Sequence, residues 1–178
     1  MVPEAKLVRS DDGLVPQGEG WCVVNARESR WFGSDELGRY CHFEGDVRFA
    51  ELGINVNVLQ PGQPSCMYHG ESNQEDFLVL AGECLLLIEG EERPLRAWDF
   101  VHCPPWTEHV LVGAGSGPCV FVAVGARSGD QQVRYPVAEV ARKHDAGVLE
   151  ETTRAEEAYA RFSPLAERPY GEGDLPDW

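Results

Sequence analysis

The amino-acid sequence predicts an all-β protein whose strands close into a sandwich or barrel. Three observations support this class. Residues 54–58 alternate β-branched and polar side chains, which is the period of a strand with two different faces. Two short apolar runs follow at 77–80 and 84–88, and strand and turn signals recur from there to residue 124. The 178 residues are expected to form one domain.

The chain divides into three parts by composition. Residues 1–20 are polar and contain several turn-forming residues, so we expect an N-terminal arm. Residues 21–128 carry the strand signals and are assigned to the barrel, which opens with a strand at 21–24. Residues 129–178 are expected to form a helical segment followed by an extended tail.

The strands of the barrel region are placed by their apolar runs. Ala81, Gly82 and Glu83 separate the first two runs, which predicts a tight hairpin between them. Because neither run alternates with polar residues, both strands are expected to be covered on both faces. Further strands are expected at 100–103, 109–112 and 119–124.

The C-terminal part carries helix signals. Pro136 suits a first helical turn and Gly147 follows the end, which predicts a short helix over 135–141. Thr153 and Glu156 match a capping box and predict a second helix. Three apolar residues of the extended tail are expected to pack on the barrel or on a partner subunit: Tyr170, Leu175 and Trp178.

Net charge and cysteine usage narrow the classes of partner. With 30 acidic and 15 basic side chains the net charge is −15, which disfavours nucleic acid and membrane surfaces as partners. The six cysteines occur singly, without a C-x-x-C pair, and are expected to be mostly small buried apolar residues. Since no signal-peptide pattern opens the chain, we expect a cytoplasmic protein.

Four residues form a candidate metal site. If the strand near Glu75 alternates, Glu75 shares a face with Phe77 and points into the barrel mouth. A divalent cation would offset the cost of burying that carboxylate. His69 and Glu71, two apart on an extended segment, would reach the ion from one side, and His109 from a later strand would reach it from the opposite wall. Such a set suits one Zn, Fe, Mn or Ni ion with positions left for water or substrate.

This segment resembles the cupin superfamily. His69, Glu75 and Gly82 fit the first cupin motif, and Glu71 stands where the family's second histidine would be. The resemblance implies a double-stranded β-helix, or jelly-roll barrel, followed here by the short C-terminal helices. A carboxylate in place of a histidine makes the ligand set harder and leaves the identity of the metal open.

The second cupin motif is matched less completely. Pro104 and His109 fit it, whereas Trp98 and Trp106 replace its two glycines and Gly113 replaces its asparagine. The resemblance covers about fifty residues by motif. It implies a fold more firmly than an activity, since cupin-like proteins include enzymes, binding proteins and regulatory domains.

The leading functional hypothesis is a metal-dependent enzyme that acts on a small molecule, of dioxygenase, isomerase or lyase type. Two alternatives stay open: a non-catalytic module that binds a metal or ligand for sensing or storage, and a metal-free epimerase-like barrel. Glu71 is either a ligand or a general base. Trp106 and Tyr68 are candidates for the substrate pocket. The family's habit of pairing through sheet edges implies a homodimer.

Overall fold

The structure, a computed structural model, describes residues 1–176 and confirms the all-β class. A seven-stranded sheet has the order β10 (Phe100–Cys103), β7 (Glu75–Ala81), β12 (Cys119–Ala126), β5 (Leu52–Leu59), β4 (Arg39–Cys41), β3 (Trp31–Gly33), β14 (Ala166–Arg168). A three-stranded sheet has the order β11 (His109–Ala114), β8 (Glu83–Ile88), β9 (Glu91–Arg96). Two short ribbons pair β1 (Lys6–Ser10) with β2 (Gly13–Gln17) and β6 (Gly70–Glu71) with β13 (Val133–Arg134).

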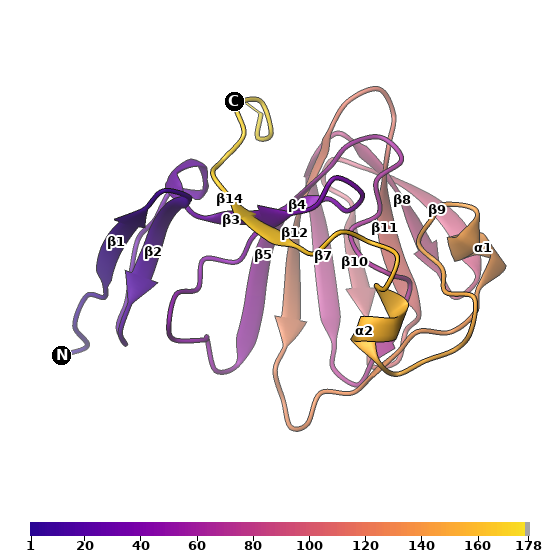
Figure 1. The fold of residues 1–178 in the computed structure, drawn as a ribbon, viewed down its shortest axis with the longest axis horizontal. Coiled ribbons are helices and arrows are strands. Elements are labelled where there is room, and N and C mark those ends of the chain that lie inside the picture. Colours follow the sequence, from indigo (N-terminus) through magenta and orange to yellow (C-terminus); the bar gives the residue numbers. More distant parts are fainter. Residues whose placement is uncertain (177–178) are drawn as a thin grey trace.

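The two larger sheets enclose the main core (Figure 1). Phe77, Val79 and Phe121 from the large sheet pack with Leu86 and Leu111 from the small one, and all five are buried. Every ladder between strands is antiparallel, so successive side chains alternate between this core and the outer faces.

Strand β8 is covered on both faces, as its unbroken apolar run predicts. Leu86 belongs to the main core, whereas Leu87 is fully buried on the other face. There it packs with Ala141 of helix α1 (Glu139–Arg142) and with Ala146 just beyond it. The helical segment therefore covers the outer face of the small sheet.

The hairpin expected at Ala81–Glu83 is wrong. Strand β7 pairs with β10 and β12, and β8 pairs with β9 and β11, so the chain crosses from one sheet to the other at Gly82. Gly82 has φ +74° and a Cβ there would lie 2.2 Å from the carbonyl oxygen of Pro118. A hairpin and a sheet-to-sheet corner use the same kind of turn residue, so the sequence pattern does not separate them.

Strand β5 presents its β-branched side chains outward. Val56 and Val58 pack in an outer cluster with Trp31 and Val120, which confirms that they share one face. The intervening Asn55 and Asn57, with Leu59, occupy the face that looks into the barrel. The polar positions of the alternating pattern are thus on the inside at this end of the barrel.

Strand β9 was not predicted from the sequence. It contains Pro94 and mostly charged side chains, and it forms the edge of the three-stranded sheet beside β8. An edge strand tolerates proline because one row of its N–H groups has no partner strand. Its connection to β8 is the two-residue turn Glu89-Gly90, with φ values of 48° and 81°, as hairpin geometry requires.

The N-terminal arm contains more structure than expected, and the strand expected at 21–24 is wrong. Residues 6–17 form the β1–β2 hairpin, which projects from one end of the barrel (Figure 1). Trp21 makes a single bridge with Glu4, and Val23 is 76% exposed. These apolar residues have no neighbouring strand to pair with, and the 3-10 helix η1 (Ala26–Glu28) follows.

The C-terminal helices are shorter than the patterns suggest. Helix α1 begins three residues beyond Pro136, and helix α2 spans Ala155–Ala158. The predicted capping box does not form: Arg154 is the N-cap residue, and its N–H donates to Thr152 Oγ1. Neither four-residue helix is long and apolar enough to cross a membrane, among the residues described.

The tail packs against the barrel. Strand β14 pairs with β3, and the ring of Tyr170 lies 6.0 Å from that of Trp31, measured between centroids. Leu175 joins the same outer cluster, which confirms the predicted docking of the tail on the barrel for these two residues. Trp178 lies outside the described residues. The domain boundaries at residues 20 and 128 stay predictions.

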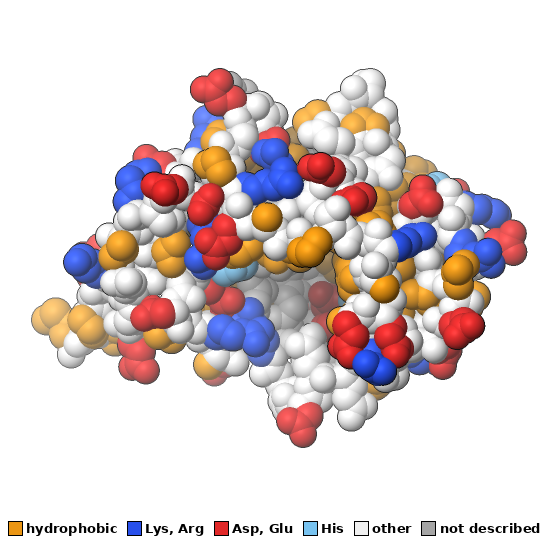
Figure 2. Space-filling model, viewed as in Figure 1, with side chains coloured by type: hydrophobic (Ala, Val, Ile, Leu, Met, Phe, Trp, Pro, Cys, Tyr) orange, Lys and Arg blue, Asp and Glu red, His pale blue; other side chains and the backbone are white. Residues whose placement is uncertain are grey.

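Acidic and basic side chains are interspersed over the surface. Figure 2 shows the basic side chains scattered among acidic ones on the face in view, instead of gathered into one patch. The expectation that nucleic acid is not a partner stays a prediction.

Candidate metal centre

His69 and His109 are brought together by a backbone bridge between two segments far apart in sequence. The N–H of His109 donates to His69 O at 2.8 Å, and the N–H of His69 donates to His109 O at 3.2 Å. The two ring centroids are 5.1 Å apart. Two imidazoles are therefore fixed side by side by the backbone, before any ligand binds.

Backbone carbonyls also orient the two rings. His69 Nδ1 lies 2.8 Å from Met67 O, and His109 Nδ1 lies 2.9 Å from Thr107 O. Since a carbonyl oxygen only accepts, each Nδ1 carries the hydrogen and each Nε2 is left to face the site. This is the arrangement in which a metal-binding histidine presents Nε2 to an ion.

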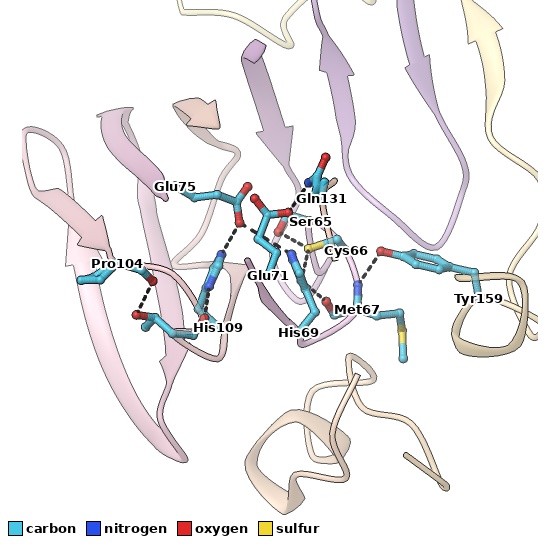
Figure 3. Close-up of polar contacts among 11 residues, drawn as sticks. Ser65, Cys66, Met67, His69, Glu71, Glu75, Pro104, His109, Gln131 and Tyr159 are labelled. Carbon is cyan, nitrogen blue, oxygen red and sulfur yellow. Dashed lines mark hydrogen bonds and ion pairs between the residues drawn. The ribbon is translucent and has the colours of Figure 1, made fainter. Parts of the chain in front are cut away.

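Glu75 completes a group of three ligating side chains. It begins strand β7, and its Oε2 lies 3.1 Å from His109 Nε2 and 3.6 Å from His69 Nε2. The ligand atoms of the three residues all lie within 4.8 Å of one another. Figure 3 shows the three side chains converging from β7, from the segment before β6 and from the start of β11.

The three residues fit a divalent ion. Glu75 Oε2 is buried and, among the described residues, has no partner in hydrogen-bond geometry, although the two Nε2 atoms lie within ion-pair distance of it. A buried carboxylate is costly without a counter-charge, and a cation between Glu75 and the imidazoles would supply that charge in place of the protonated histidines. Two imidazoles and one carboxylate form a donor set used for zinc, iron and other first-row metals.

The ionisation of the group reflects its close contacts. Burial opposes the charged form of Glu75, but the contacts with His109 and His69 outweigh it and lower the pKa of Glu75 to about 2. Burial likewise opposes the charged form of His109, yet the contacts with Cys103 and Glu75 raise its pKa to about 10. The metal-free site is therefore held together as an ion pair that a metal would replace.

Glu71 lies beside this group and is held by a separate contact. Its side chain is buried, and its Oε2 accepts a hydrogen bond of 2.5 Å from Gln131 Nε2. Burial and the neighbouring Glu75 raise the pKa of the Glu71 carboxyl. Glu71 does not belong to the three-residue group with mutually close ligand atoms, in the described part of the chain. Its role as ligand or base stays a prediction.

A cavity of about 260 Å³ opens onto the three residues of the candidate metal site. Its wall combines the ligands with aromatic, amide and small side chains from both sheets and from the C-terminal segment. The lining residues are Tyr40, Asn55, Asn57, Ser65, Cys66, His69, Glu75, Phe77, His109, Leu111, Phe121, Ala123 and Tyr159.

Neither Tyr68 nor Trp106 lines this cavity, and their part in substrate binding stays a prediction. Tyr68 is 1% exposed and packs on the outer face of the small sheet, where its hydroxyl accepts a hydrogen bond from the N–H of Gly90. Alternation along the extended segment turns Tyr68 away from the side that His69 faces. Trp106 is 46% exposed in the loop before β11.

Several lining residues were missed by the sequence reasoning. Asn55 and Asn57 occupy alternate positions of a strand, where asparagine is unfavourable, and this was a usable signal of function. Tyr159 reaches the cavity from the C-terminal segment, and its hydroxyl accepts from the N–H of Met67. No local pattern marks a contact between residues 92 positions apart.

The fold and site define a β-barrel protein with a histidine–carboxylate centre at the barrel mouth. Residues 55–125 match the family model described as "Cupin domain", a span that contains all three ligands. Over this span the chain is similar to the cupin family, and its double-stranded β-helix fold is the one the motifs imply. No curated protein sequence matches the chain.

Solved structures with a similar fold include two described as sugar phosphate isomerases. A putative one from Acidithiobacillus ferrooxidans is 28% identical, with 47% of this chain and 55% of that chain covered and a TM-score of 0.45. One from Silicibacter pomeroyi is 24% identical, with coverages of 54% and 63% and a TM-score of 0.48. A Cupin 2 conserved barrel domain protein from Salinispora arenicola is 25% identical, with coverages of 53% and 79% and a TM-score of 0.46. This chain thus spans less than two thirds of the two isomerases.

Proposed function

We propose that the protein is a metal-dependent enzyme that acts on a small molecule. One divalent transition ion, Zn, Fe, Mn or Ni, would be held by His69, Glu75 and His109. The observation that carries this proposal is the buried Glu75 Oε2, which faces two oriented imidazoles and, among residues 1–176, has no partner in hydrogen-bond geometry. When bound, such an ion polarises a carbonyl or enediol oxygen, and iron adds oxygen chemistry.

The chain's own residues have separable tasks in this proposal. Glu75 supplies negative charge to the ion. The carbonyls of Met67 and Thr107 accept from the two Nδ1 atoms and so keep the Nε2 atoms of both histidines directed at the ion. The wall formed by Phe77 and Phe121 excludes water from one side of the substrate.

Glu71 is proposed as the group that moves a proton. It stands next to the ligands, and Gln131 fixes its position through the hydrogen bond to Oε2. A carboxyl whose pKa is raised can both hold and accept a proton nearer to neutral pH, which suits a general acid–base. This favours isomerase or lyase chemistry over simple ligand storage.

Elemental analysis of protein purified without chelator tests the metal. We expect one transition ion per chain in the parent and in Glu91→Gln, whose side chain is 64% exposed and serves as the control. Glu75→Gln and His109→Ala should lose it. A parent without metal would contradict the proposal and favour the metal-free epimerase-like alternative.

Water exchange at the ion separates an enzyme from a binding module. Protein loaded with Mn²⁺ should show fast proton relaxation of bulk water, because an open coordination position admits an exchanging water. A bound ion without exchangeable water would indicate a closed site and favour the sensing or storage alternative.

A homodimer is also proposed. Strand β10 forms the edge of the large sheet, and Phe100 and the preceding Trp98 are 63% and 72% exposed. Exposed aromatic side chains on an open sheet edge support pairing with a second copy. The cytoplasmic location stays a prediction.

A further inference from the structure

The cavity has an amide wall at the end remote from the metal ligands. Asn57 on β5 is opposite Phe121 on β12, and Glu75 on β7 is opposite Gly125 on the other side of β12. Phe121 and Gly125 are four residues apart along β12. Strands β5 and β7, which flank β12 on its two sides, are about 10 Å apart. A molecule that occupies the cavity therefore reaches from the ligands of the ion toward the asparagines.

Asn57 carries a donor that the protein does not use. Its Nδ2 is buried and has no hydrogen-bond partner in the described part of the chain. A buried amide N–H without an acceptor is destabilising, and Asn57 belongs to the wall of the cavity. A bound molecule with an oxygen at this end would provide the missing acceptor.

The rest of the cavity wall does not favour a negatively charged ligand. None of the lining residues named above is a lysine or an arginine, and in the metal-loaded protein the two histidines are neutral ligands of the ion, so a phosphate group would find no cationic side chain there. Phe77, Leu111, Phe121 and Ala123 form an apolar section. A cavity of about 260 Å³ corresponds to roughly nine water molecules, at about 30 Å³ each, and so to a ligand of roughly ten non-hydrogen atoms.

On the basis of the proposed metal centre, we propose that Asn57 determines the class of substrate. Its Nδ2 donates a hydrogen bond to a hydroxyl or carbonyl oxygen at the far end of an uncharged small molecule. The near end of that molecule carries the oxygen atoms that meet the ion at His69, Glu75 and His109. A phosphorylated sugar is excluded from this class.

A matched pair of probes tests the proposed hydrogen bond from Asn57, which we call the anchor. Kojic acid is a metal-binding hydroxypyranone with a hydroxymethyl group opposite its chelating oxygens, and allomaltol has a methyl group in its place. Calorimetric titration of the metal-loaded protein should show kojic acid binding about three- to tenfold more tightly, which is the range for one neutral hydrogen bond. Asn57→Leu should reduce this preference to less than twofold.

Two further variants make the result specific. Asn57→Ala removes the donor without adding an acceptor to which the hydroxymethyl group could donate, and it should also lose the preference. Gln60→Leu removes an exposed amide outside this cavity and should retain it. Equal binding of both probes by the metal-loaded parent, or a preference that survives in Asn57→Leu, overturns the anchor alone. Absence of metal from the parent overturns the proposed function and the anchor together.

Discussion

His69 and His109 exchange backbone hydrogen bonds of 3.2 and 2.8 Å, so the two imidazoles of the candidate metal centre lie on one antiparallel bridge. The bridge joins the segment before β6 to the start of β11. Because the backbone of the barrel fixes both rings, the ligand geometry does not depend on a bound ion, and the metal-free protein is expected to fold.

The two glutamates should differ in their effect on metal affinity. Glu75→Gln removes the carboxylate that faces both Nε2 atoms and should weaken metal binding by at least about a hundredfold. Glu71→Gln should weaken it by less than about tenfold, because Gln131 already holds that carboxyl. Competition with a fluorescent chelator measures both constants. Equal losses in the two variants would show that Glu71 is a ligand.

The metal-free protein should lose stability as the pH rises above 6.5. His109 has a pKa of about 10 in the folded state against 6.5 for an ordinary histidine. The folded state therefore holds a proton that the unfolded chain releases in this window, and its stabilisation is lost progressively between pH 6.5 and 10. The contribution of Glu75 is present above pH 4.5 and is lost as the pH falls toward 2.

Urea unfolding at pH 6.5, 8 and 9, with chelator and then with saturating metal, measures this effect. With saturating metal, the stability is expected to rise with pH instead of falling, because protons compete with the ion for the imidazoles. The metal-free Glu75→Gln variant should show a smaller alkaline loss. A metal-free parent whose stability is unchanged over this range would contradict the ion pair.

Gly82 should be required at the corner between the sheets. Gly82→Ala combines a positive φ of 74° with a Cβ 2.2 Å from Pro118 O, and we expect a loss of more than about 3 kcal/mol in the free energy of unfolding. Gly90→Ala is the matched control, since its φ is 81° and nothing lies within 4 Å of its Cβ. It should cost only about 1–2 kcal/mol. Equal costs would show that the close approach to Pro118 relaxes freely.

Edge strand β10 should mediate self-association. Sedimentation equilibrium at micromolar concentration is expected to give the mass of a dimer for the parent and of a monomer for the double variant Trp98→Ser, Phe100→Ser. Leu165→Ser, at a position 48% exposed beside β14 on the other edge, is the control and should remain dimeric. A monomeric parent would refute the homodimer.

The sequence by itself located most of the barrel strands and grouped the three residues of the candidate metal site. Alternation and apolar runs located β5, β7, β8, β10, β11 and β12, because the period of side chains along a strand is a local property. The motif spacing predicted that His69, Glu75 and His109 share one metal site, and the structure brings these three side chains together. The sequence showed a carboxylate at Glu71, but it did not predict the hydrogen bond of that carboxylate to Gln131.

Only the tertiary structure decided which strands pair and which side chains line the cavity. Gly82 marks a turn in either topology, and whether it closes a hairpin or changes sheets depends on contacts with Pro118. The alternation of β5 does not say which face is inside, and the core placed Asn55 and Asn57 there. Tyr159 joins the cavity through a contact of long sequence separation. Such choices depend on the packing of the whole chain, which no short segment encodes.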